Sequence, residues 1–125
     1  MPTTASLRAA CAVTVGLTLA LTTASVVSAT PALASLPCSF RERNGHWYCD
    51  NVHGAPVYYA PNPYQGTAGY MFTRPSWFIC RTDNGGYVGG PHPTRWLATV
   101  ADNGRAGYMK DTDIYSETDP LPVCP

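Results

Sequence analysis

Proline and glycine interrupt this chain so often that long helices are excluded. The sequence has 12 Pro and 11 Gly among 125 residues. Proline removes a backbone donor, and glycine weakens any regular element that contains it. Between these breaks lie runs of four to six β-branched, aromatic or apolar residues, such as "APVYYA", "GYMFT", "SWFICR", "RWLATV" and "AGYM". This pattern predicts an all-β sandwich or barrel of short strands.

Residues 1–34 have the order of features typical of a secretory signal peptide. Arg8 is the one charged side chain at the N-terminus, and a charge-free run rich in Ala, Val, Leu and Thr follows it. Ala32 and Ala34 then occupy the two small positions before a cut at Ser35. The apolar run approaches the length of a bilayer span, so an uncleaved anchor is the alternative. We expect cleavage, and no stable membrane insertion after it.

The cysteine count indicates the same compartment. Removal of the signal peptide takes Cys11 with it and leaves an even set of four. They are Cys38, Cys49, Cys80 and Cys124. Thiols oxidise outside the cell, and so short a chain buries too little apolar surface to be stable without covalent support. We therefore expect two disulfides rather than a zinc site, for which no Cys-x-x-Cys spacing exists.

The first disulfide follows from a hairpin predicted in residues 35–51. Asn44-Gly45 separates "CSFRER" from "HWYCD", and this dipeptide favours a two-residue turn. Such a turn places Phe40 opposite Cys49, with Cys38 diagonally across from Cys49 on the same face. We therefore predict a Cys38–Cys49 disulfide that closes an N-terminal hairpin.

The second disulfide then joins the two cysteines that remain. Cys80 lies in the middle of a predicted strand, and Cys124 lies near the C-terminus. The competing connectivity, Cys49 with Cys80 and Cys38 with Cys124, stays open because spacing alone does not decide between them.

A phrase of Trp, five residues and Asp-Asn-Gly occurs twice, from Trp77 and from Trp96. The second copy predicts a hairpin in which "RWLATV" turns at residues 102–104 and "AGYM" returns beside it. Within that strand, Leu97 lies on the face opposite Trp96. The first copy predicts an earlier hairpin, in which "SWFICR" turns at residues 83–85 into "GYV". Both hairpins would belong to one barrel, because the chain is too short for two cores.

These residues resemble a bacterial SH3-like domain, of the exported kind found in small actinobacterial secreted proteins. The resemblance is carried by "WFICR", "RWLATVADNGRAGYM", "KDTDIY" and "LPVC", and is weaker before Trp77, where "YYAPNPYQG" stands. It implies a small SH3-like β-barrel over residues 52–125, a short 3₁₀ turn at Asp111–Asp113 and a last strand at Ile114-Tyr115. It transfers no individual binding residue, because the family's ligand-binding positions lie in loops that differ here.

Charge and motif content exclude several classes of function. Eight Lys and Arg balance eight Asp and Glu, so no basic surplus exists to bind nucleic acid or an anionic membrane. The three histidines lack the spacing of a metal pair, and no serine has a Gly-x-Ser-x-Gly context. The stretch "DTDIYSETD" fails as a calcium loop, because Tyr115 and Ser116 replace a ligand and the turn glycine. We interpret it as a solvated edge and tail, and expect no enzyme, no metal and no cofactor.

A surplus of aromatic residues is the strongest indication of function. Tyr58 and Tyr59 are consecutive on a strand, so one faces the core and the other faces solvent. Tyrosine combines an apolar ring with a polar hydroxyl and is common in binding sites. Resemblance to SH3-like barrels implies an aromatic groove for cell-wall peptide, or for another extracellular peptide or protein; a mere cover for the core is the alternative. The predicted lining is Tyr59, Tyr64, Tyr87, Trp77, Trp96 and Tyr115.

A second hypothesis concerns the loop Gly89–Arg95, "GGPHPTR". Its two prolines restrict the backbone and Arg95 ends it, as expected of a small secreted protease inhibitor or an extracellular accessory protein. His92 within it is expected to be a solvated loop residue. Under either hypothesis we expect a monomer that is secreted or associated with the cell wall.

Overall fold

The strands of this protein form two antiparallel sheets. The structure is a computed structural model that describes residues 35–125 together with Gly16, Thr18 and Ala20. Apart from those three residues, the predicted signal peptide lies outside the described residues. No helix in the described part of the chain has the length and apolar character needed to cross a membrane.

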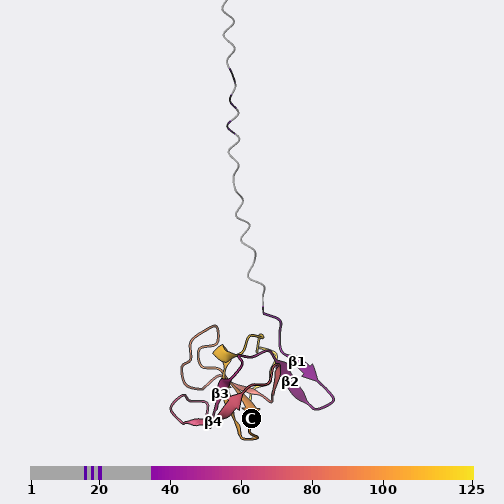
Figure 1. Ribbon diagram of the computed structural model, residues 1–125, viewed down its shortest axis with the longest axis vertical. Coiled ribbons are helices and arrows are strands. Elements are labelled where there is room, and N and C mark those ends of the chain that lie inside the picture. Colours follow the sequence, from indigo (N-terminus) through magenta and orange to yellow (C-terminus); the bar gives the residue numbers. More distant parts are fainter. Residues whose placement is uncertain (1–15, 17, 19, 21–34) are drawn as a thin grey trace, which may run out of the picture. The chain divides into compact units, whose positions relative to one another are not determined.

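Short strands and one 3₁₀ turn, η1, make up the regular structure. In chain order they are β1 (Ser39–Arg41), β2 (His46–Cys49), β3 (Ala55–Tyr58), β4 (Thr67–Met71), β5 (Ser76–Phe78), β6 (Arg81–Thr82), β7 (Trp96–Val100), β8 (Ala106–Lys110) and η1 (Asp111–Asp113). One sheet has the order β1-β2-β5 and the other β4-β3-β8-β7-β6. Figure 1 shows the β1–β2 hairpin set to one side of β3 and β4. The predicted all-β fold with a short 3₁₀ turn is confirmed.

The segment from β5 to β6 passes from one sheet to the other. β5 pairs with β2, whereas β6 pairs with β7. Between them, the backbone N–H of Ile79 donates to the carbonyl oxygen of Ala98 at 3.0 Å. The N–H of Ala98 donates in turn to the carbonyl oxygen of Cys80 at 2.9 Å. The predicted hairpin from "SWFICR" into "GYV" is therefore wrong. Residues 83–85 instead open the long connection between β6 and β7.

The β1–β2 hairpin has a longer turn than predicted. Arg41 pairs with His46, which leaves the four residues 42–45 as the turn. A two-residue type I′ turn needs a positive φ at both central residues. Gly45 has a φ of 71°, but Asn44 does not have a positive φ. The predicted two-residue turn is therefore wrong, and so is the strand register predicted from it, in which Phe40 lay opposite Cys49.

Both predicted disulfides are present, and the competing connectivity is excluded. The corrected register places Cys38 directly opposite Cys49, with 4.6 Å between their Cα atoms. The bond between Cys80 and Cys124 has a Cα–Cα distance of 5.0 Å and spans 44 residues of sequence. It ties the segment between the sheets to the C-terminal residues.

β7 and β8 form the predicted hairpin, which contributes the centre of the core. Leu97 pairs with Met109, and both side chains are fully buried. Gly104 closes the turn with a φ of 85°, a conformation that favours glycine. The remaining buried members of this apolar core are Cys38, Cys49, Ala55, Val57, Met71, Phe78, Ala101, Ile114 and Leu121.

The chain that follows η1 is held from two sides. Ile114 forms an isolated bridge with Asn51, so the predicted last strand at Ile114-Tyr115 is reduced to a single bridge. Further on, the backbone N–H of Glu117 donates to the carbonyl oxygen of Leu36 at 3.0 Å. These contacts place this segment as a wall beside the N-terminal residues of the described unit.

Candidate functional site

Trp96 is buried within the structure. It is 0% exposed, and its indole Nε1–H donates to the carbonyl oxygen of Gly86 at 2.9 Å. Tyr58 meets the indole edge to face, with 5.5 Å between ring centroids. A Cβ atom at Gly85 would lie 2.1 Å from the indole ring, so only glycine lets the loop cover Trp96 there. Trp96 therefore offers no surface to a ligand.

Tyr64 and Tyr87 lie on two loops that contact each other. The backbone N–H of Gly86 donates to the carbonyl oxygen of Pro61 at 2.9 Å, which joins the two loops. The two side chains are 90% and 78% exposed. They are available to a partner, but they extend into solvent.

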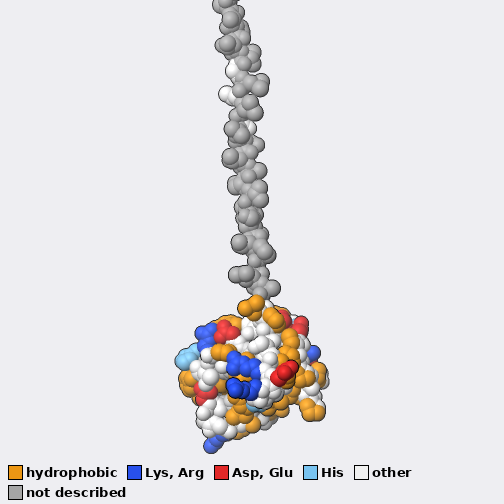
Figure 2. Space-filling view, turned by 90° about the vertical axis from the view of Figure 1, so that its right-hand side faces the viewer, with side chains coloured by type: hydrophobic (Ala, Val, Ile, Leu, Met, Phe, Trp, Pro, Cys, Tyr) orange, Lys and Arg blue, Asp and Glu red, His pale blue; other side chains and the backbone are white. Residues whose placement is uncertain are grey.

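Tyr59 and Trp77 line separate hollows. Tyr59 borders a hollow of about 180 Å³ on the outer face of β7 and β8. Trp77 borders one of about 50 Å³, and its ring stacks on His46 with 4.0 Å between centroids. Figure 2 shows one face of the molecule, where hydrophobic side chains are interspersed with basic and acidic ones. The structure does not bring the six predicted aromatic residues into one groove.

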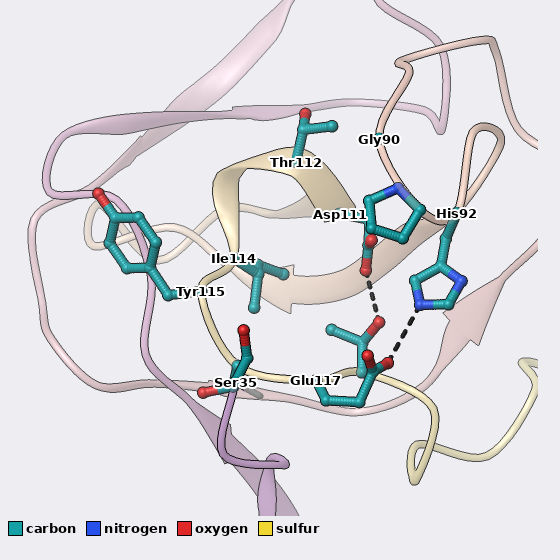
Figure 3. Close-up of a pocket in the computed structure, with 11 residues that line it drawn as sticks. Ser35, Gly90, His92, Asp111, Thr112, Ile114, Tyr115 and Glu117 are labelled. Atoms are coloured by element: carbon teal, nitrogen blue, oxygen red, sulfur yellow. Dashed lines mark hydrogen bonds and ion pairs between the residues drawn. The ribbon is translucent and has the colours of Figure 1, made fainter. Parts of the chain in front are cut away.

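Tyr115 lines two hollows, which we call together the Tyr115 groove. The larger hollow has a volume of about 300 Å³ and the smaller about 240 Å³, and Ser116 also borders both. The walls come from the segment Asp111–Thr118, the loop Gly90–His92 and the N-terminal residues 35–36. Figure 3 shows the larger hollow, with Asp111, His92 and Glu117 on the side away from the Tyr115 ring.

Within the loop Gly89–Thr94, the residues Gly90, Pro91 and His92 form one wall of the larger hollow. Pro91 and Pro93 restrict the backbone on both sides of His92. The imidazole Nε2 of His92 lies 3.1 Å from Oε1 of Glu117, and the His92 side chain is 21% exposed. The expectation of a solvated loop histidine is wrong, because this side chain is held against a carboxylate of the opposite wall.

Arg95 lies just after this loop and is almost fully buried. Its side chain is 7% exposed. Nε donates to Oδ1 of Asp83 at 2.6 Å, and Nη1 donates to Oγ1 of Thr118 at 3.0 Å and to Oδ1 of Asp119 at 2.8 Å. Burial lowers the pKa of the guanidinium, but the bonds to the two carboxylates outweigh burial and raise the pKa above its usual value. The loop therefore does not present Arg95 to an enzyme.

Asp111 is the most deeply buried acid of the site. It is 6% exposed, and one carboxylate oxygen accepts a hydrogen bond from the hydroxyl of Thr118. Burial raises the pKa of this carboxyl; the bond from Thr118 and the charges of His92 and Arg95 offset only part of that effect. A buried carboxyl of raised pKa that lines a hollow is typical of a functional site.

Three side chains of the site have the spacing of metal ligands. Ligand atoms of His92, Glu117 and Asp119 all lie within 4.8 Å of one another. However, Nη1 of Arg95 lies 2.8 Å from Oδ1 of Asp119 and 4.0 Å from Oε1 of Glu117. The guanidinium thus already supplies the positive charge that a metal would bring, and the arrangement is that of an ion-pair network.

Sequence reasoning missed this group of polar residues. It placed the acidic stretch in a solvated tail and considered His92 alone. Two signals point to the group in retrospect. One is the Pro-His-Pro sequence, whose two prolines restrict the backbone around His92. The other is the order of acidic and neutral residues at Glu117, Thr118 and Asp119: in an extended segment the two acids lie on one side and Thr118 on the other.

No family model, no curated protein and no solved structure matches this chain. The resemblance to SH3-like domains therefore rests on the sequence stretches quoted above. The function of the site must be argued from its own geometry.

Proposed function

We propose that this protein is an exported, non-catalytic binding module that holds an extracellular peptide in the Tyr115 groove, with cell-wall peptide as the first candidate. The observation that carries this proposal is the pair of hollows that share Tyr115 and Ser116. Alternate side chains of an extended peptide are about 7 Å apart on one face. Two hollows that share Tyr115 and Ser116 can take two such side chains.

The chemistry of the groove supports a peptide ligand. Tyr115 is 54% exposed and Leu36 is 82% exposed, so apolar surface is available at the smaller hollow. The Arg74 guanidinium carbon lies 5.5 Å from the Tyr115 ring centroid, and Arg74 pairs with Asp50 at 2.9 Å. Apolar walls with a few fixed polar groups are typical of ligand sites, and tyrosine loses little entropy when it orders.

Export, an SH3-like barrel and a monomeric state belong to the same proposal. The two disulfides are consistent with an extracellular protein, free or attached to the wall. Two antiparallel sheets joined through the β5–β6 segment are compatible with a small, partly open barrel. We assign no catalytic step or cofactor, because in the described residues the His92–Glu117 pair has no hydroxyl or thiol hydrogen-bonded to the imidazole.

Co-sedimentation with purified peptidoglycan tests the proposal. The protein with its disulfides oxidised is expected to show saturable retention that persists at moderate salt. Tyr115→Ala should weaken retention about tenfold or more, as for an aromatic residue at the centre of an interface. Tyr70→Ala is the matched control, because Tyr70 on β4 is 51% exposed and does not border the groove.

Two results would contradict the proposal. One is retention no greater than that of an unrelated secreted β protein. The other is equal loss of retention in the Tyr115 and Tyr70 variants, which would indicate adhesion by exposed aromatic rings in general.

A further inference from the structure

Asp111 has a carboxylate oxygen without a partner. The Thr118 hydroxyl donates to Oδ1, and no other donor to this carboxylate is found among the described residues. Every fully buried side-chain nitrogen or oxygen in that part of the chain has a hydrogen-bond partner. Oδ2 therefore keeps some exposure, and since Asp111 lines the larger hollow, we infer that this oxygen faces it.

The positive charges of His92 and Arg95 compensate the Asp111 carboxylate only in part. None of the ion pairs formed between described residues involves Asp111. Arg95 directs its side-chain donors to Asp83, Asp119 and the Thr118 hydroxyl. Its charge acts on Asp111 from a distance, and among the described residues the guanidinium makes no hydrogen bond to the Asp111 carboxylate. Glu117 is different, since His92 and the backbone N–H of Asp119 both contact it. A buried carboxylate with one neutral partner is destabilised unless something else pairs with it.

The rest of the hollow is suited to an alkyl stem. Pro91, Ile114 and the methyl-bearing Thr112 line it together with Tyr115. Figure 3 shows Ile114 between the Tyr115 ring and the polar end, where Asp111, His92 and Glu117 lie. A side chain that lies along the hollow from Tyr115 would thus pass Ile114 and reach a carboxylate. A volume of about 300 Å³ accommodates one long side chain.

We propose that the larger hollow is a subsite for a primary ammonium group on an alkyl stem, such as the side chain of a lysine or another diamino acid in the bound peptide. This inference rests on the proposed peptide-binding function. One free carboxylate oxygen suits an ammonium, which donates single hydrogen bonds in several directions. A guanidinium prefers a bidentate carboxylate, and Asp111 already uses one oxygen for Thr118.

An NMR titration of the oxidised, ¹⁵N-labelled protein tests the subsite directly. The probes are Nα-acetyl-lysine methylamide and its Nε-acetylated counterpart, which keeps the stem and removes the charge. The lysine probe should shift the amide signals of Gly90, His92 and residues 111–118 in a saturable way. The acetylated probe should bind about tenfold to a hundredfold more weakly, as expected for loss of a hydrogen bond between charged groups.

Variants assign the effect to one carboxylate. Asp111→Asn keeps an acceptor for the Thr118 hydroxyl. It should lower the affinity for the lysine probe by about the same factor as acetylation of the probe does. Asp113→Asn is the matched control, because Asp113 lies in the same 3₁₀ turn but does not line the hollow. It should leave the affinity unchanged. The comparison of the two probes on the unmodified protein needs no variant, so it holds even if Asp111→Asn perturbs folding.

Equal binding of both probes, shifts outside the hollow only, or an unchanged affinity in Asp111→Asn would overturn the inference. These outcomes are separable from failure of the peptide-binding function. If Tyr115→Ala abolishes retention on peptidoglycan while the two lysine probes bind equally, the groove binds peptide but does not select an ammonium group. If the lysine probe binds through Asp111 but the protein is not retained on peptidoglycan, the ammonium subsite is supported and its ligand comes from another peptide.

Discussion

Two buried regions of opposite chemistry meet at the start of β7. Leu97 is fully buried in an apolar core beside its partner Met109. Arg95, two residues earlier, is nearly as buried, but it lies among hydrogen-bond partners such as Asp83 and Thr118. Apolar burial is non-directional, so many side chains of suitable size would fill the first region. The second region needs each donor opposite its acceptor. The apolar region therefore supplies most of the stability, and the polar region positions the groove wall.

The largest effect is expected where the two regions are joined. The Cys80–Cys124 disulfide ties the segment between the sheets to the C-terminal segment that carries part of the polar region. Replacing both cysteines by serine should lower the free energy of unfolding by about 4 kcal/mol in the chain-entropy model. The shorter Cys38–Cys49 loop should contribute about 3 kcal/mol by the same model. Urea denaturation of the two double variants measures both losses, and a larger loss for Cys38/Cys49 would contradict the ranking.

The next effect tests the apolar region. Leu97→Ala should lower the free energy of unfolding by about 3 kcal/mol, because it leaves a cavity at the centre of the core. Val100→Ala on the same strand is the control, because Val100 is only half-buried, and a loss of about 1 kcal/mol or less is expected there. Similar losses in both variants, measured by urea denaturation, would mean that the core is not centred on Leu97.

The apolar region was the part that the sequence could predict. Alternation along "RWLATV" placed Leu97 and Trp96 on opposite faces, and the Asp-Asn-Gly turn placed β8 beside β7. Both signals are local and depend on strand periodicity. The even set of cysteines predicted two disulfides, and the hairpin between Cys38 and Cys49 favoured the correct pairing although its predicted register was wrong. Periodicity did not show that loop residues Gly85 and Gly86 also cover the outer face at Trp96.

The polar region and the groove could not be predicted in this way. Asp83 and Thr118 are far apart in the sequence, and each meets Arg95 only because the long loop and the C-terminal segment pack together. No periodic pattern encodes such single contacts between irregular segments. The surplus of tyrosine indicated a binding surface, but composition does not say where a ring lies. Tyr115 borders the groove, whereas Tyr64 extends into solvent.

A smaller effect is expected from the polar region. Arg95→Met keeps an unbranched, apolar side-chain stem and removes the charged guanidinium. Breaking a deeply buried pair costs about 3–5 kcal/mol. Asp83 is 41% exposed and regains water, so we expect a loss of about 1–2 kcal/mol. Arg74→Met removes an exposed pair with Asp50 and should lower the free energy of unfolding by less than about 1 kcal/mol.

The measurement is urea denaturation of both variants, with an NMR spectrum of Arg95→Met. Signals of residues 89–94 should shift, because the loop loses its anchor. A loss of stability as large as that of Leu97→Ala would contradict the division between the two regions. So would unchanged loop signals in Arg95→Met.

The smallest effect is a dependence on pH that arises from Asp111. Burial raises the pKa of its carboxyl in the folded protein above the ordinary value of 3.8, and Glu117 adds to the rise. Thr118, His92 and Arg95 act in the opposite direction without cancelling it. The folded state therefore binds more protons than the unfolded chain between the ordinary and the raised pKa. The contribution of Asp111 to stability is fully present below the ordinary pKa and is lost as pH rises through the raised pKa.

Asp111→Asn isolates this contribution, because an amide does not titrate. The free energy of unfolding of the unmodified protein, minus that of the variant, should fall as pH rises from about 4 towards neutrality. Urea denaturation at a series of pH values measures it, and Asp102→Asn provides a contrast of opposite sign. Burial also acts on Asp102, but hydrogen bonds from Thr73 and Phe72 lower its pKa overall. For Asp102, the free energy of unfolding of the unmodified protein minus that of the Asp102→Asn variant should rise with pH over the acidic range. A flat profile for Asp111 would mean that this carboxylate is well paired when the groove is empty, and the polar region would then be complete without a ligand.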